Sequence, residues 1–165
     1  MSGPRLPSAH WLLTVNKLSQ SDHYRLLADA AADFASRGHS IARTRSLVNA
    51  TPDFDLRTWR QMAGLGWTGM RVPEAAGGMG LGLREITLVA QPLAAALVPE
   101  PLAAITVLAG SALALGDNDA LKYALLRQLA DGTLIPALAW QETAGSIDPA
   151  ELQTTARLHD ASSKF

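Results

Sequence analysis

The sequence predicts a mainly α-helical fold, a bundle of amphipathic helices followed by the first strands of an incomplete β region. Three observations support this prediction. Apolar residues recur at helical spacing from residue 21 to residue 132, capping residues or glycines bound most of these runs, and strand-like alternation begins only at residue 134. We therefore divide the 165 residues into a flexible arm at 1–20, a helical domain at 21–132 and the start of a truncated β domain at 133–165.

The composition is that of a globular protein, with 48% apolar and 18% charged residues. The net charge of −1 gives no electrostatic attraction to nucleic acid, so we expect no nucleic-acid partner. There is no cysteine, and the four histidines are scattered, so we expect no metal site and a cytoplasmic protein. The longest apolar stretch is interrupted by Pro92, Pro99 and Pro101, and we expect no membrane span.

Three helices are predicted before residue 67. Ser21 is expected to cap the first helix and Ser40 to cap a shorter second one. Asp55 is expected to begin a third helix, which ends near Gly64 or Gly66. The residues expected to face inward are Tyr24, Leu27, Ala31, Phe34, Ile41, Thr44, Leu47, Val48, Leu56, Trp59, Met62 and Ala63.

Residues 67–82 form a glycine-rich connector, with glycines at positions 77, 78, 80 and 82. The connector lacks the Gly-Lys-Ser/Thr ending of a phosphate-binding loop, and no convincing strand precedes it. A nucleotide-binding loop is therefore not expected here. We expect a tight turn packed on the bundle.

Three more helices are predicted after the connector. Pro92 is expected to produce a kink or an irregular turn in the first of them, which covers 83–97. Pro101 suits the first turn of the next helix, whose faces are apolar nearly all round. That pattern is typical of a helix buried in a core, and also of the wall of an apolar pocket. Asp117 is expected to cap the last helix, which ends by Gly132.

The segment 134–148, LIPALAWQETAGSID, joins a strand-like half to a small polar half. Residues 142–146 offer backbone N–H groups, a hydroxyl and a glycine that allows close approach, which are features of a cofactor contact. A surface β-turn has the same composition. A second strand is predicted over 153–159. Two strands leave unpaired edges, so we expect the β region to need more chain or a partner.

Four runs of residues carry a resemblance to a known family. They are WRQMAGLGW at 59–67, VPEAAGGMGLG at 72–82, PEPL at 99–102 and the segment 137–148. Together they resemble the N-terminal half of a flavin-dependent acyl-CoA dehydrogenase. Members of that family have a helical N-terminal domain, a middle β domain and a C-terminal four-helix domain. The resemblance implies that this chain holds the first domain and the opening strands of the second.

The resemblance also implies a chemistry and a site. FAD would lie between the middle domain and the C-terminal helices, where a carboxylate takes the α proton of an acyl-CoA while the β hydrogen leaves as hydride to the flavin. That carboxylate belongs to the C-terminal domain in most members, so we expect no catalytic residue within 1–165. The implied cofactor contacts are Trp140, Gln141, Gly145 and Ser146. The implied partners are an acyl-CoA of fatty acid metabolism and another acyl-CoA dehydrogenase chain, in a homo- or hetero-oligomer.

The family's usual motif, Thr-Glu-Pro-x-Ala-Gly-Ser-Asp, is altered in this chain. Gln141 stands in the threonine place, the proline is absent, and one residue fewer precedes Ala144. The Gln-Glu pair is similar to divergent bacterial members such as pimeloyl-CoA dehydrogenase small subunits. Two hypotheses follow. The chain is the N-terminal part of an FAD-dependent acyl-CoA dehydrogenase and is inactive alone, or it is a non-catalytic helical module that assembles with a partner dehydrogenase chain.

Overall fold

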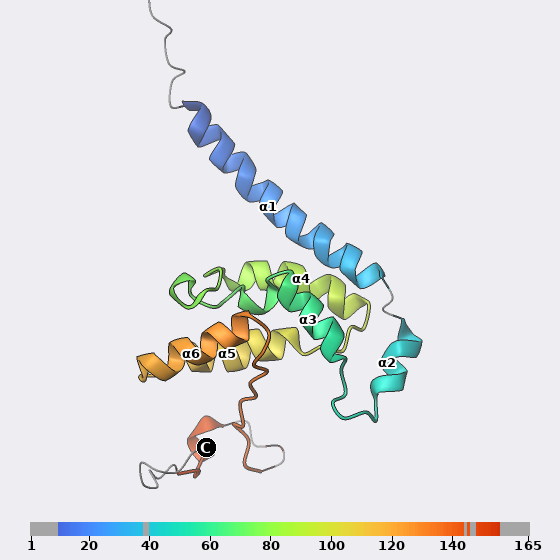
Figure 1. The fold of residues 1–165 in the computed structure, drawn as a ribbon, viewed down its shortest axis with the longest axis vertical. Coiled ribbons are helices and arrows are strands. Elements are labelled where there is room, and N and C mark those ends of the chain that lie inside the picture. Colours follow the sequence, from blue (N-terminus) through green and yellow to red (C-terminus); the bar gives the residue numbers. More distant parts are fainter. Residues whose placement is uncertain (1–9, 38–39, 144, 146–147, 156–165) are drawn as a thin grey trace, which may run out of the picture.

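The computed structural model describes residues 10–37, 40–143, 145 and 148–155, and confirms a mainly helical fold. A helical bundle carries a long helix projecting at one end and an extended segment leaving at the other (Figure 1). The helices are α1 (His10–Ser36), α2 (Ile41–Leu47), α3 (Leu56–Gly64), α4 (Leu83–Ala95), a π-helical segment (Ala104–Ala109) that continues into α5 (Gly110–Ala114), and α6 (Asp119–Ala130). Short 3-10 turns lie at Trp67–Gly69, Glu74–Ala76 and Pro149–Glu151. None of the described helices is long and apolar enough to span a lipid bilayer.

The first helix starts earlier than predicted. α1 begins at His10, so Ser21 lies inside the helix and the prediction that it caps the helix is wrong. Residues 10–20 of the predicted arm are helical, and residues 1–9 lie outside the described residues. α1 packs along α4, with the Arg84 guanidinium 4.3 Å from the centre of the Tyr24 ring.

The second helix is attached to the bundle by polar contacts. Ser40 caps it as predicted, because the Arg43 N–H donates to Ser40 Oγ at 3.2 Å. The predicted inward face is wrong, since none of the residues of α2 is buried and Ile41 is 54% exposed. Instead, the Thr44 hydroxyl donates to the carbonyl oxygen of Leu97 at 2.9 Å. A helix of seven residues with such contacts contributes little to the core.

A buried ion pair joins α2 to the residues before the π-helical segment. The Arg43 guanidinium contacts both carboxylate oxygens of Glu100, through Nη2 to Oε1 and through Nη1 to Oε2 at 3.5 Å. The Glu100 side chain is 0% exposed and that of Arg43 is 19% exposed. The Asp55 N–H also donates to Glu100 Oε1 at 3.2 Å. One carboxylate therefore holds α2, the start of α3 and the chain at residue 100 together.

The third helix supplies the centre of the core. Asp55 stands at the start of this helix, α3, as predicted, and it is the N-cap, because its side chain accepts a hydrogen bond from the Arg57 N–H at 2.8 Å. Trp59 is buried, and its indole N–H donates to the carbonyl oxygen of Gly132 at 3.0 Å. The buried apolar residues are Ala31, Ala35, Trp59, Met62, Trp67, Met70, Val72, Ala76, Ile86, Val89, Leu93, Leu102, Ile105, Ala109, Leu126 and Leu129.

The cap at Asp55 makes part of the stability depend on pH. The hydrogen bond from the Arg57 N–H is the main cause that lowers the pKa of the Asp55 carboxyl. A group with a depressed folded pKa stabilises the fold above its unfolded pKa, about 3.9, and this contribution disappears as the pH falls through the folded pKa. In urea unfolding, we expect Asp55→Asn to be less stable than the parent at neutral pH, with the difference shrinking in acid. The exposed Asp53→Asn is the control, and a difference that grows in acid would contradict this account.

The connector is a tight turn packed on the bundle, as predicted. Its two ends are joined by backbone hydrogen bonds from Gly80 N–H to the Val72 oxygen at 2.8 Å and from Leu81 N–H to the Met70 oxygen at 2.7 Å. Gly77 closes the turn with φ of +84°, a left-handed conformation that favours glycine. The Thr68 hydroxyl ties the turn to α6 by donating to the Ala130 oxygen at 2.8 Å.

The later helices differ from prediction in two details. Pro92 lies inside α4, which continues as an α-helix to Ala95, so the irregular turn expected there does not form. The irregular part of this region is a π-helical segment at Ala104–Ala109, after Pro101. Asn118, not Asp117, caps α6, because its side-chain oxygen accepts a hydrogen bond from the Leu121 N–H at 3.1 Å.

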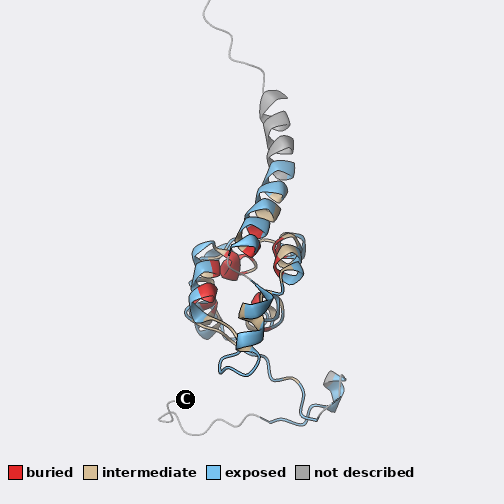
Figure 2. Cartoon of the chain, turned by 90° about the vertical axis from the view of Figure 1, so that its right-hand side faces the viewer, coloured by how far each residue is buried: buried red, intermediate tan, exposed pale blue. Residues whose placement is uncertain are grey.

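The chain after α6 leaves the bundle. Residues 134–141 are neither helical nor paired in a sheet within the described chain, so the strand predicted there does not form. A strand needs a neighbour to accept its ladder hydrogen bonds, and the described residues provide none. Of the second predicted strand, 153–155 has no regular structure and 156–159 lies outside the described residues. Figure 2 shows that the buried residues are in the bundle, whereas this segment is mostly exposed.

Candidate functional site

The predicted cofactor segment lies on the extended chain beyond α6, outside the bundle (Figures 1 and 2). Trp140 is half-buried, Gln141 and Gly145 are exposed, and Ser146 lies outside the described residues. Gly145 has φ of +87°, and no atom lies within 4 Å of the position that a Cβ would take. The backbone at residue 145 is therefore open to close approach. The role of these four residues in binding a cofactor stays a prediction.

Glu142 closes this segment into a loop. Its carboxylate accepts hydrogen bonds from the backbone N–H groups of Gln153 at 2.9 Å and Thr154 at 2.5 Å, and also from the Thr154 hydroxyl. The Thr154 hydroxyl is the main cause that lowers the pKa of the Glu142 carboxyl. Glu142 therefore holds the loop in shape and is not placed as a free base.

A cavity of about 400 Å³ opens beside this loop. It is lined by Trp140, Glu142, Thr143, Asp148, Glu151, Leu152 and Gln153. Three of the lining side chains are carboxylates, and residues 133–155 contain no lysine or arginine. Within the described chain, no group of three acidic or histidine side chains converges as metal ligands would. The cavity is therefore acidic, and an anionic group placed there would need cations from elsewhere.

A second cavity is apolar and lies between helices α5 and α6 and the start of the extended chain. Its volume is about 320 Å³, and its lining includes Leu113, Leu121, Leu125, Pro136 and Leu138. Ala109 and Ala112 also line it, whereas Ile105 is buried in the core. The helix after Pro101 therefore contributes to the core and also to the wall of an apolar pocket, the two roles that its apolar pattern predicted. The sequence did not predict this cavity, because its walls come from separate segments, 109–125 and 136–138, that only the tertiary fold brings together.

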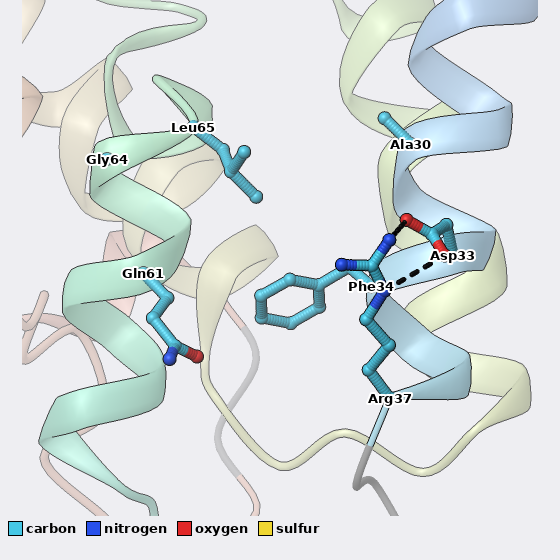
Figure 3. Close-up of a pocket in the computed structure, with 7 residues that line it drawn as sticks. All are labelled: Ala30, Asp33, Phe34, Arg37, Gln61, Gly64 and Leu65. Carbon is cyan, nitrogen blue, oxygen red and sulfur yellow. Dashed lines mark hydrogen bonds and ion pairs between the residues drawn. The ribbon is translucent and has the colours of Figure 1, made fainter.

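A groove of about 510 Å³ separates α1 from α3 (Figure 3). Phe34 extends from α1 toward Gln61 of α3 and Leu65 directly after it, and its ring lies 5.1 Å from the Trp67 ring, edge to face. The charges at the edge of the groove, Asp33 of α1 and Arg37 directly after this helix, pair with one another. The groove therefore presents packing contacts and no converging polar groups, and we assign no ligand to it.

Fold and site together define a helical domain that presents an apolar cavity and a polar loop at one end. Residues 21–133 match the family model described as the acyl-CoA dehydrogenase N-terminal domain. The chain belongs to the acyl-CoA dehydrogenase family. The resemblance of residues 59–67 and 72–82 to this family is thus confirmed.

Individual relatives are distant and longer. The acyl-CoA dehydrogenase IpdE2 of Mycobacterium tuberculosis is 29% identical over 122 residues, which cover 73% of this chain and 37% of the relative. The acyl-CoA dehydrogenase FadE12 of the same species is 28% identical over 147 residues, which cover 88% of this chain and 37% of the relative. A solved structure, the Tcur3481-Tcur3483 steroid ACAD variant, superimposes with a TM-score of 0.61 at 28% identity, covering 68% of this chain and 30% of that one. The chain thus spans little more than a third of these curated relatives.

Proposed function

We propose that the chain is the N-terminal part of an FAD-dependent dehydrogenase that desaturates an acyl-CoA thioester between its α and β carbons. The observation that carries this proposal is the match of residues 21–133 to the acyl-CoA dehydrogenase N-terminal domain. When bound, the flavin supplies the chemistry by accepting the β hydrogen as hydride. The relatives named acyl-CoA dehydrogenase support the same reaction class.

The apolar cavity is the proposed site for part of the acyl chain. Its volume of about 320 Å³ is at the lower end of the roughly 300–1,000 Å³ of pockets that hold small ligands. Leu113, Leu121 and Leu125 make its walls apolar, and the chain at Pro136 and Leu138 leads from it directly to Trp140. An acyl chain held there would exclude water and lie on the same side of the bundle as the proposed flavin contacts.

The residues near Trp140 are the proposed flavin contacts of this chain. The Gln141 amide would donate to a ring oxygen of the flavin, and the open backbone at Gly145 would allow the cofactor to approach. Ser146 would bind a phosphate oxygen. Because residues 133–155 hold three carboxylates and no lysine or arginine, the cations that neutralise the pyrophosphate would come from outside this segment. We also infer that this chain alone is inactive, and that it works in the cytoplasm in an oligomer with another acyl-CoA dehydrogenase chain.

The acidic, shortened loop also favours a second candidate, a non-catalytic module that assembles with a dehydrogenase and contacts no flavin. Measuring the flavin content distinguishes this non-catalytic module from the FAD-dependent dehydrogenase proposed first. We expect the purified chain to be colourless and to leave the fluorescence anisotropy of added FAD unchanged. A complex with its partner dehydrogenase chain is expected to be yellow, and Gln141→Ala is expected to lower its flavin content severalfold.

The matched control is Gln128→Ala on α6, which is expected to leave the flavin content of the complex unchanged. If Gln141→Ala and Gln128→Ala complexes carry the same flavin as the parent, the flavin does not contact Gln141 and the non-catalytic module is the better description. Tight binding of FAD by the chain alone would contradict the proposal that this chain supplies only part of the flavin site.

A further inference from the structure

Arg71 is a cation whose positive charge is not neutralised within the described part of the chain. It lies in the connector between two buried residues, Met70 and Val72, so its side chain emerges where the connector faces the helix 104–114. Its Nη2 donates to Ser111 Oγ at 3.4 Å, a long hydrogen bond. Its Nε is buried and has no hydrogen-bond partner. Among the described residues, the cations that pair with carboxylates are Arg25, Arg37, Arg43 and Lys122. No described carboxylate forms an ion pair with Arg71.

A small cavity lies beside this guanidinium. Its volume is about 180 Å³, and its lining consists of Arg71, Val72, Thr106, Gly110, Ser111, Ala114 and Leu115. The Thr106 hydroxyl already donates to the Leu102 oxygen at 2.7 Å. The Ser111 hydroxyl accepts from Arg71, so its own proton remains for a further acceptor. The side chains around the cavity thus offer donors and a positive charge, and no carboxylate.

These donors suit a carboxylate better than a phosphate. The Nε and Nη2 edge of a guanidinium matches the two oxygens of a carboxylate, which it binds with two parallel hydrogen bonds. One arginine neutralises one negative charge, whereas a phosphate dianion would keep an uncompensated charge in a partly buried site. The ligand chemistry indicated by the charge is therefore a monovalent carboxylate.

The rest of the lining indicates what is attached to the carboxylate. Val72 and Ala114 give apolar walls, and Leu115, which is 83% exposed, lies at the cavity. The cavity of about 180 Å³ is smaller than the roughly 300–1,000 Å³ of pockets that hold drug-sized ligands, so it suits only a short chain. We propose that the Arg71 cavity is a binding site for the carboxylate at the end of a short hydrocarbon chain. This site does not depend on the proposed dehydrogenase activity.

The test is a titration of the 165-residue chain with acetate, propionate and butyrate at constant ionic strength, followed by NMR of the arginine Nε–H groups. One of these signals is expected to shift with each acid, and its loss in Arg71→Gln would assign it. Affinity is expected to rise with chain length, by up to about fourfold for each methylene group buried. Inorganic phosphate is expected to shift the same signal only at much higher concentration.

Two matched variants separate binding from folding. Arg60→Gln, at an exposed position on α3, is expected to keep the shift and its dependence on chain length. Ser111→Ala keeps Arg71 and is expected to weaken butyrate severalfold while the remaining amide spectrum stays that of the folded chain. The proposal is overturned if none of the three acids shifts the Arg71 signal, or if phosphate binds as well as butyrate.

Discussion

Glu100→Gln is expected to lower the free energy of unfolding by about 3 kcal/mol, because it leaves the largely buried Arg43 guanidinium with only the more distant Asp55 carboxylate, at 3.9 Å, as a counter-charge. The Glu100 side chain is inaccessible to solvent and contacts Arg43 through both carboxylate oxygens. The same carboxylate accepts the Asp55 N–H at the start of α3. Urea unfolding, followed by the fluorescence of the buried Trp59 and Trp67, measures the loss.

Two controls show whether the loss comes from the unpaired charge. The double variant Arg43→Met with Glu100→Leu removes both charges, and we expect it to recover most of the lost stability. Glu74→Gln, at an exposed position in the connector, is expected to change stability by less than about 0.5 kcal/mol. If Glu100→Gln costs no more than Glu74→Gln, the ion pair does not hold α2 and α3 together.

Gly78→Ala is expected to cost about 3 kcal/mol, because the connector has no room for a side chain at this residue. A Cβ on Gly78 would lie 2.2 Å from the oxygen and 2.6 Å from the carbonyl carbon of Val72. These are backbone atoms, and Val72 is fixed by the hydrogen bond from Gly80 N–H, so they cannot move aside cheaply. The midpoint of thermal unfolding is expected to fall accordingly.

Gly64→Ala is the matched control for this substitution. No atom lies within 4 Å of the position that a Cβ would take on Gly64, the last residue of α3. Alanine there is expected to be neutral or to stabilise the chain by up to about 1 kcal/mol, since it restricts the unfolded state. Equal midpoints for the two alanine variants would show that the connector adjusts to a side chain at residue 78.

Local features of the sequence predicted much of the fold. Ser40 and Asp55 act as caps because a cap depends on the three residues that follow it. The start of α1 was not predictable in the same way, since no proline or glycine interrupts residues 10–36 and a serine within that run need not end the helix. Periodicity also placed Ile41 and Val48 inward, although both are exposed. An apolar stripe does not show whether the rest of the chain covers it.

The candidate site was also predicted only in part, because a local pattern does not show which distant residues pack together. The polar composition of 142–146 indicated where to look, and the described residues of this segment, 142, 143 and 145, are exposed. The hydrogen bonds from Gln153 and Thr154 to Glu142, and the apolar cavity between Ala109 and Leu138, join residues separated by eleven to 29 positions. Such contacts follow from tertiary packing, which a local pattern does not contain.

The hydrogen bond from Trp59 to Gly132 has a consequence for the described residues that follow α6. Gly132 has φ of +71°, and a Cβ there would lie 2.3 Å from that of Ala63, so α3 presses directly on the residue where the chain turns away. The angle at which the following residues depart is thus set in the protein interior and not by the loop that they form. Residues at the centre of the bundle thereby fix the start of the chain that leads to Trp140.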